Sequence, residues 1–84
     1  MFSQQISYIK TLSPSPIIND YLDRINILNL DEPENRTSAN FIQASRLANE
    51  ICLYAETASV YIEDKAEDLL EMINNAYKLH VKGQ

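Results

Sequence analysis

The chain of 84 residues contains very few of the residues that interrupt helices. Its only glycine is Gly83, and its three prolines, Pro14, Pro16 and Pro33, lie in the first half of the chain. A glycine-rich phosphate loop therefore cannot be built, and residues 34–82 carry no strong helix breaker. Because the alternation of apolar and polar residues that marks strands is also almost absent, the sequence predicts an all-α protein.

Cysteine and basic residues are scarce as well. The single cysteine, Cys52, cannot form an internal disulfide, so packing has to hold the fold, which suits a reducing compartment. Seven basic residues stand against twelve acidic ones, and the formal net charge of −5 argues against a nucleic-acid partner. Without a long apolar run or a basic stretch after Met1, we expect no transmembrane segment, no export signal and a cytoplasmic location.

What is present is the composition of an ordinary folded protein. Hydrophobic residues make up 45% of the chain and charged residues 23%, far from the values of disordered chains. A chain this short cannot divide its core between two units, because only about 60% of its unfolded surface becomes buried. We therefore expect a single domain over residues 1–84.

Two shorter helices are expected before the loop "LDEPENRTS". Phe2, Ile6 and Ile9 have helical spacing and predict a short first helix. The segment "SPSP" ends it, because residues before proline are pushed out of the helical region, and Ser15 can cap a second helix that starts at Pro16. The buried face expected for this second helix is Ile18, Tyr21, Leu22, Ile25 and Leu28.

Two longer apolar stripes follow the loop, with Thr37 or Ser38 as the expected N-cap. The first stripe is rich in small side chains, which let neighbouring helices approach closely. Its members are Phe41, Ala44, Leu47, Ala48, Ile51, Cys52, Ala55 and Ala58. The members of the second stripe are Ala66, Leu69, Leu70, Ile73, Ala76, Tyr77 and His80.

The stretch "ASVYIEDKAEDLL", residues 58–70, decides whether these stripes belong to one helix or to two. The stripes stay nearly in phase, so a continuous helix over residues 37–81 is allowed by periodicity. Such a rod would be about 68 Å long, at 1.5 Å per residue, and a monomer would leave much of its apolar stripe exposed.

Local chemistry also favours a reversal of the chain. The β-branched and aromatic residues at 60–62 lose side-chain freedom in a helix, and Asp64 with Glu67 resembles a capping box at which a helix can restart. We therefore predict a short extended link at Tyr61–Glu63, which folds the fourth helix back on the third as an antiparallel hairpin. The first two helices complete an antiparallel four-helix bundle.

The sequence offers three candidates for chemistry, and each has a structural explanation. His80, the only histidine, is expected as a partly buried helix residue and not as an acid or base, and Cys52 as a small apolar group on the stripe. The carboxylates of residues 63–71 could attract a divalent cation or a cationic peptide, but their spacing fits a solvated helix face and not a calcium loop. We expect no enzyme activity, no metal and no cofactor.

The segment Arg46–Tyr77, "RLANEICLYAETASVYIEDKAEDLLEMINNAY", resembles the second half of the immunity proteins that protect lactic acid bacteria from pediocin-like bacteriocins, in particular the enterocin A immunity group. Arg46 and Leu47 correspond to the opening of the family's third helix, Val60–Ile62 to its short link, and Glu67–Leu70 to the start of its last helix. The likeness covers about two fifths of the chain.

This resemblance implies a cytoplasmic four-helix bundle that acts by binding and not by catalysis. Its expected target is a bacteriocin bound to its membrane receptor, the sugar permease of the mannose phosphotransferase system, whose pore would be blocked. The family's C-terminal half is associated with the choice of bacteriocin, so the resemblance implies partner-binding residues at the hairpin and at the end of the last helix. These residues are Tyr61, Glu63, Tyr77, Lys78, His80 and Lys82.

A second interpretation remains open. The same sequence could be an intracellular helical adaptor or chaperone that buries its apolar stripe against a partner or against a second copy. In both cases the protein would act by binding one state of a partner better than another. The immunity protein is expected as a monomer, whereas the adaptor could self-associate.

Overall fold

The structure, a computed structural model, describes residues 1–12 and 15–83 and contains four α-helices and no strand in that part of the chain. The helices are α1 (Phe2–Leu12), α2 (Pro16–Leu28), α3 (Ser38–Glu56) and α4 (Val60–Lys82), with a 3-10 turn at Pro33–Asn35 between α2 and α3. The prediction of an all-α fold is confirmed.

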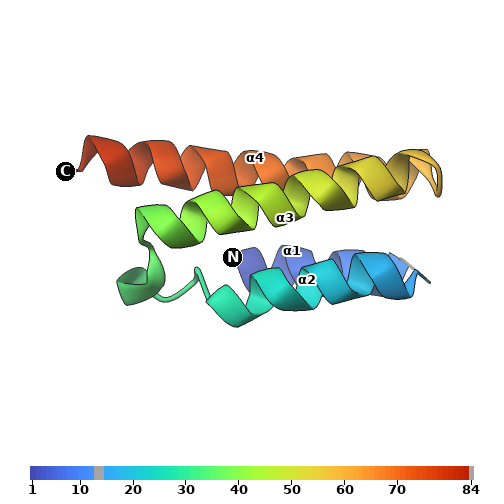
Figure 1. Cartoon of the computed structure of the whole chain (residues 1–84), viewed down its shortest axis with the longest axis horizontal. Helices are drawn as coiled ribbons and strands as arrows, with labels where there is room; N and C mark the ends of the chain where they lie inside the picture. Colours follow the sequence, from blue (N-terminus) through green and yellow to red (C-terminus); the bar gives the residue numbers. More distant parts are fainter. Residues whose placement is uncertain (13–14, 84) are drawn as a thin grey trace.

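The helices run alternately in opposite directions (Figure 1). Helix α3 packs against α2 and α4, and α1 packs against α2 and α4, so the helices close around a common core. The molecule measures 39 × 18 × 17 Å, which excludes a continuous helix of residues 37–81. The antiparallel hairpin of α3 and α4 and the four-helix bundle are therefore confirmed.

The reversal lies earlier in the chain than predicted. Helix α3 ends at Glu56, and α4 begins at Val60 with Ser59 as its N-cap. The Ser59 hydroxyl accepts a hydrogen bond from the Ile62 N–H at 3.5 Å. Ala58, predicted on the buried stripe, is exposed in the turn.

The predicted link Tyr61–Glu63 is instead the first turn of α4, and Asp64 lies inside the helix and not at a cap. The prediction was wrong because it did not consider Ser59 as an N-cap and gave too much weight to the low helix preference of residues 60–62. That preference costs only about half a kcal/mol per residue, and the Ser59 cap together with the burial of Ile62 offsets it.

The N-caps of α2 and α3 are confirmed. Ser15 and Thr37 each accept a hydrogen bond from the backbone N–H three residues later, at 3.4 and 3.2 Å, and Pro16 occupies the first turn of α2. The two residues predicted to end the first helix, Ser13 and Pro14, lie outside the described residues.

The core draws on every helix. It contains most of the predicted buried positions, together with Leu30, which was assigned to the polar loop, and Ile62, which was assigned to the link. The buried residues are Phe2, Ile6, Ile9, Ile18, Leu22, Ile25, Leu30, Phe41, Ala44, Ala48, Ile51, Ala55, Ile62, Ala66, Leu69 and Ile73. Several predicted members are only half-buried at the edge of this core: Tyr21, Leu28, Leu47, Cys52, Leu70, Ala76 and Tyr77.

Candidate functional site

A hollow of about 670 Å³ lies beside the last turns of α4, which extend beyond the start of α1 (Figure 1). Helix α4 contributes one wall with Met72, Asn75, Ala76, Leu79 and His80. The other wall is formed by Met1, Pro33 and Arg36. None of these side chains is a carboxylate, and the volume falls within the range of about 300 to 1,000 Å³ that is common for ligand sites.

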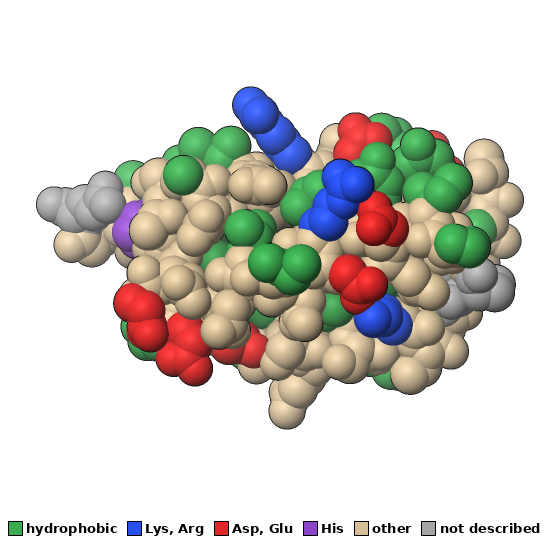
Figure 2. Space-filling view, turned by 60° about the horizontal axis from the view of Figure 1, so that its bottom comes forward, with side chains coloured by type: hydrophobic (Ala, Val, Ile, Leu, Met, Phe, Trp, Pro, Cys, Tyr) green, Lys and Arg blue, Asp and Glu red, His purple; other side chains and the backbone are tan. Residues whose placement is uncertain are grey.

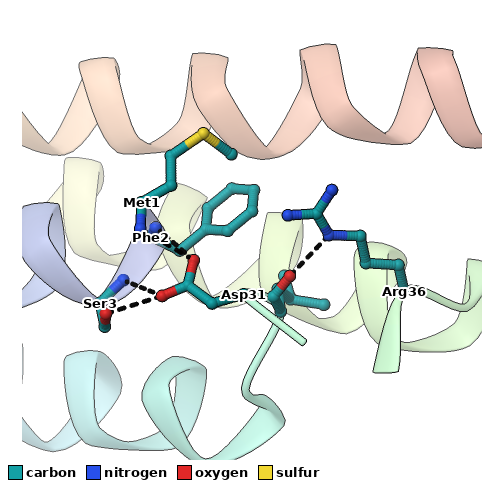
Figure 3. A network of polar contacts seen from close by, with 6 residues as sticks. Met1, Phe2, Ser3, Asp31 and Arg36 are labelled. Carbon is teal, nitrogen blue, oxygen red and sulfur yellow. Dashed lines mark hydrogen bonds and ion pairs between the residues drawn. The ribbon is translucent and has the colours of Figure 1, made fainter. Parts of the chain in front are cut away.

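Asp31 fixes the loop that carries this second wall (Figure 3). Its carboxylate accepts hydrogen bonds from the Phe2 N–H at 2.7 Å, the Ser3 N–H at 3.1 Å and the Ser3 hydroxyl at 2.7 Å, and lies 3.2 Å from the amino nitrogen of Met1. The first N–H groups of a helix have no partner within it, so Asp31 caps α1 from a remote position in the sequence.

The electrostatics of Asp31 follow from these contacts. Burial by itself raises the pKa of the Asp31 carboxyl, but the hydrogen bonds from the Ser3 hydroxyl and from the Phe2 and Ser3 N–H groups outweigh burial. Together they hold the pKa well below its ordinary value of 3.8. The carboxylate is thus charged at neutral pH and engaged with α1.

Arg36 is held in place on the same loop. Its Nε–H donates to the Leu30 carbonyl at 2.7 Å, and its Cζ lies 5.7 Å from the centroid of the Phe2 ring. Figure 3 shows the guanidinium beside that ring, with its terminal nitrogens turned away from the Leu30 carbonyl. Within residues 1–12 and 15–83, no carboxylate lies within 4.0 Å of this guanidinium. Arg36 therefore presents free N–H donors at the wall of the hollow.

Other basic residues do have acidic neighbours. Lys10 lies 2.5 Å from Asp23, Arg24 lies 3.0 Å from Asp20, and Lys65 lies 3.9 Å from an α4 carboxylate. Figure 2 shows basic and acidic side chains next to one another on the visible face, with hydrophobic side chains beside them. The basic residues that lack such a neighbour among the described residues are Arg36, Arg46, Lys78 and Lys82.

Tyr77 and His80 pack against α3 near the hollow. The ring of Phe41 stacks on Tyr77 with centroids 5.5 Å apart and an interplanar angle of 22°, and its centroid lies 5.5 Å from that of His80. Both side chains are half-buried. His80 is thus the partly buried helix residue that the sequence predicted, and it also lines the hollow.

The structure divides the predicted partner-binding residues between the two ends of α4. Tyr61 and Glu63 lie in its first turn, and Tyr61 is about 24 Å from Tyr77 at 1.5 Å per residue. The Tyr61 hydroxyl is 2.5 Å from the Tyr8 hydroxyl, and the Lys65 ammonium lies 5.5 Å from the Tyr61 ring centroid. These contacts explain Tyr61 as part of the packing between α1 and α4.

The remaining predicted residues do lie together at the end of α4. Tyr77, Lys78 and Lys82, with Val81, line a smaller hollow of about 370 Å³ on the other flank of the helix from His80. This part of α4 has no acidic residue from Met72 onward, whereas residues 63–71 contain five. The candidate site is therefore the end of α4, and the hairpin is not part of it.

Sequence reasoning missed Arg36 and Met72. Arg36 is the only basic residue of the loop "LDEPENRTS", which was a usable signal, but its contacts with Leu30 and Phe2 depend on tertiary structure. Met72 lies between the buried residues Leu69 and Ile73, outside the expected stripe.

The Cys52 thiol is not an activated nucleophile. Burial, with Glu67 and Glu63 nearby, raises the pKa of the half-buried Cys52 thiol to about 11, so the thiol is protonated at neutral pH. Among the described residues, no group of three or more histidine, cysteine or acidic side chains is placed to hold a metal ion.

The fold and the site define a small antiparallel helical bundle with an apolar hollow edged by a fixed arginine. Comparison with protein-family models, with curated proteins and with solved structures finds no match for this chain. In the part of the chain that is described, no helix has the length and apolar character needed to cross a bilayer.

Proposed function

We propose that this protein is a bacteriocin immunity protein, a non-catalytic cytoplasmic binder that protects its cell from a pore-forming, pediocin-like bacteriocin. The observation that supports the proposal is the antiparallel α3–α4 hairpin within the segment Arg46–Tyr77. Its turn lies at Thr57–Ser59, just before the Val60–Ile62 link that the resemblance implies, because Val60–Ile62 belongs to α4. The end of α4, where the candidate site lies, falls in the half that the resemblance associates with the choice of bacteriocin.

The mechanism is binding alone. The target is the bacteriocin in complex with the mannose phosphotransferase permease, at the inner face of the membrane. A bundle that binds the blocked state of this complex better than the open state shifts the population toward the blocked state. To move the ratio from 1:99 to 99:1, it has to bind the blocked state about 10⁴-fold more tightly.

Expression in a bacteriocin-sensitive strain tests the proposal. Cells that produce the protein should survive at least one member of a panel of pediocin-like bacteriocins at concentrations that kill control cells. A double variant, Lys78→Gln with Lys82→Gln, should reduce protection because it removes two positive charges of the candidate site that have no acidic neighbour among the described residues.

The matched control is Lys10→Gln, which removes an exposed lysine of α1 and should leave protection intact. Circular dichroism and the cellular level of each variant show whether it is folded and present. Unchanged killing across the whole panel, with folded protein present, would refute the proposed function.

A further inference from the structure

We propose that the hollow beside α4 binds an acidic, apolar segment of the partner protein. In this complex one carboxylate of the segment pairs with the Arg36 guanidinium, and an adjoining apolar side chain packs on Met72, Ala76 and Leu79. The inference rests on the proposed function and specifies the chemistry of the partner that this site recognises.

The first reason is the orientation of Arg36. Its Nε–H is engaged with the Leu30 carbonyl at 2.7 Å, and its plane is supported by the Phe2 ring. Arg36 lines the hollow, and its terminal nitrogens are turned away from the Leu30 carbonyl (Figure 3). A guanidinium fork matches a carboxylate with two parallel hydrogen bonds, and an arginine already held in place loses little side-chain freedom on binding.

The second reason is the distribution of charge. The carboxylate nearest in sequence, Asp31, is engaged with the first turn of α1 and is not among the residues that line the hollow. Glu32 and Glu34 are exposed on the same loop and also do not line it. Among the described residues, the hollow is thus lined by the charged Arg36 and by no acidic side chain, so it attracts a negative group despite the net charge of −5.

The third reason is the apolar face of α4. Met72, Ala76 and Leu79 have the spacing i, i+4 and i+7, which places them on one side of the helix. Leu79 is 71% exposed, and the flexible methionine side chain adapts to partners of different shape. Such a surface suits an amphipathic segment whose apolar side chains lie in the groove.

A partner segment fits this site better than a membrane does. Binding to an anionic bilayer needs clusters of about four to eight basic residues on one face. Here Lys78 and Lys82 line the smaller hollow on the other flank of α4 and do not share a face with Arg36.

The direct test is a nuclear magnetic resonance titration of the whole protein with two capped peptides, Leu-Leu-Glu-Leu and Leu-Leu-Gln-Leu. The glutamate peptide should produce saturable shifts of the Arg36 Nε–H and the Met72 methyl signals. The glutamine peptide should bind roughly tenfold more weakly, because it lacks the charge-assisted pair. Arg36→Gln should abolish this difference between the peptides, and Arg24→Gln on α2 should preserve it.

Three results of this titration would overturn the proposal. The first is that neither peptide produces saturable shifts, and the second is that both peptides bind with equal affinity. The third is that decanoate or phosphatidylglycerol vesicles bind in an Arg36-dependent way although the glutamate peptide does not bind. The last result would assign the hollow to a small amphiphile or to a lipid surface.

The bacteriocin assay supplies a second test that keeps the two proposals apart. Arg36→Gln and Leu79→Ser should each lose protection, while Arg24→Gln and Ile27→Ser should retain it. Ile27 is 80% exposed on α2 and matches Leu79 as an exposed apolar residue, so neither serine variant should change the melting temperature.

Full protection by both Arg36→Gln and Leu79→Ser would overturn the inference. If the native protein does not protect, the proposed function fails, and the peptide titration still decides the chemistry of the site.

Discussion

Asp31 is the residue on which the attachment of α1 depends most directly. We expect Asp31→Asn to lower the free energy of unfolding by about 1 to 3 kcal/mol, the usual cost of an unpaired polar group, because both carboxylate oxygens accept hydrogen bonds and an amide has only one acceptor oxygen. Urea denaturation at pH 7 measures the difference. Glu34→Gln, an exposed change in the same loop, is the control and should have almost no effect.

The effect of Asp31 depends on pH in a defined direction. Because its pKa is lowered in the folded protein, the carboxylate stabilises the fold fully above the ordinary value of 3.8, and the stabilisation is lost as the pH falls below it. The stability difference between the native protein and Asp31→Asn should therefore be constant from pH 7 to 5 and shrink below about pH 4. A difference that grows on acidification would contradict the assigned hydrogen bonds.

The reactivity of Cys52 provides a second prediction for an individual residue. Its raised pKa of about 11 means that only a very small fraction is thiolate at pH 7, and the thiolate is the reactive form. Alkylation by iodoacetamide should be much slower in the folded protein than in urea, and its rate should still be rising at pH 9.5. Mass spectrometry of timed samples measures both rates. Equal alkylation rates in the folded and unfolded states would show that the Cys52 thiol is not buried and that its pKa is not raised.

The individual residues show which contacts a sequence can reveal. The caps Ser15 and Thr37 were predictable, because each bonds a backbone N–H three residues away. The contacts of Asp31 with Phe2 and of Arg36 with the Phe2 ring join positions about 30 residues apart, and no local pattern specifies them. Arg36 was therefore missed as part of the lining of the hollow.

At the scale of the helix, the start of α4 is the sharpest test. Ser59→Ala should destabilise the protein by about 0.5 to 2 kcal/mol, because it removes the N-cap of the longest helix. Asp64→Asn, at the position where the sequence suggested a cap, should change stability by less than about 0.5 kcal/mol. Thermal melts of the two variants decide between the two boundaries, and a larger loss for Asp64→Asn would contradict the observed one.

The four helices were predictable because each has an apolar face with a clear period. The position of the α3–α4 turn was not predictable, because the apolar stripes continue in phase through it. The turn also contains neither glycine nor proline; its three residues are Thr57, Ala58 and Ser59. The start of α4 depends on the Ser59 hydroxyl. Because the chain contains several serines, the presence of this one does not reveal the helix boundary from the sequence alone.

For the molecule as a whole, stability resides in the shared core. Leu69→Ala and Ile51→Ala should each lower the free energy of unfolding by about 2 to 5 kcal/mol, because both side chains are fully buried between helices. Ile27→Ala, at an apolar residue that is 80% exposed, should have little effect. Urea denaturation of the three variants measures the differences, and similar midpoints for all three would refute the assignment of the core.

The mass in solution follows from the same packing. Because the long stripes of α3 and α4 cover each other within a single molecule, we expect sedimentation equilibrium to give the monomer mass of 9.6 kDa at micromolar concentrations. A concentration-dependent mass would instead favour the self-associating adaptor. Leu79→Ser would then show whether the end of α4 forms the contact.

The order of the helix contacts has a consequence for motion. Among the principal contacts, α1–α2, α2–α3 and α3–α4 join neighbours along the chain, and only α1–α4 joins remote segments. Topologies of this local kind fold quickly, in microseconds to milliseconds. Because α1 is the shortest of the four α-helices, we expect it to detach while the others remain associated, as a partial opening below global unfolding. Each such opening would remove the Phe2 ring that supports Arg36. The lifetime of the packed α1 helix therefore sets how long the Arg36 guanidinium keeps its orientation at the hollow.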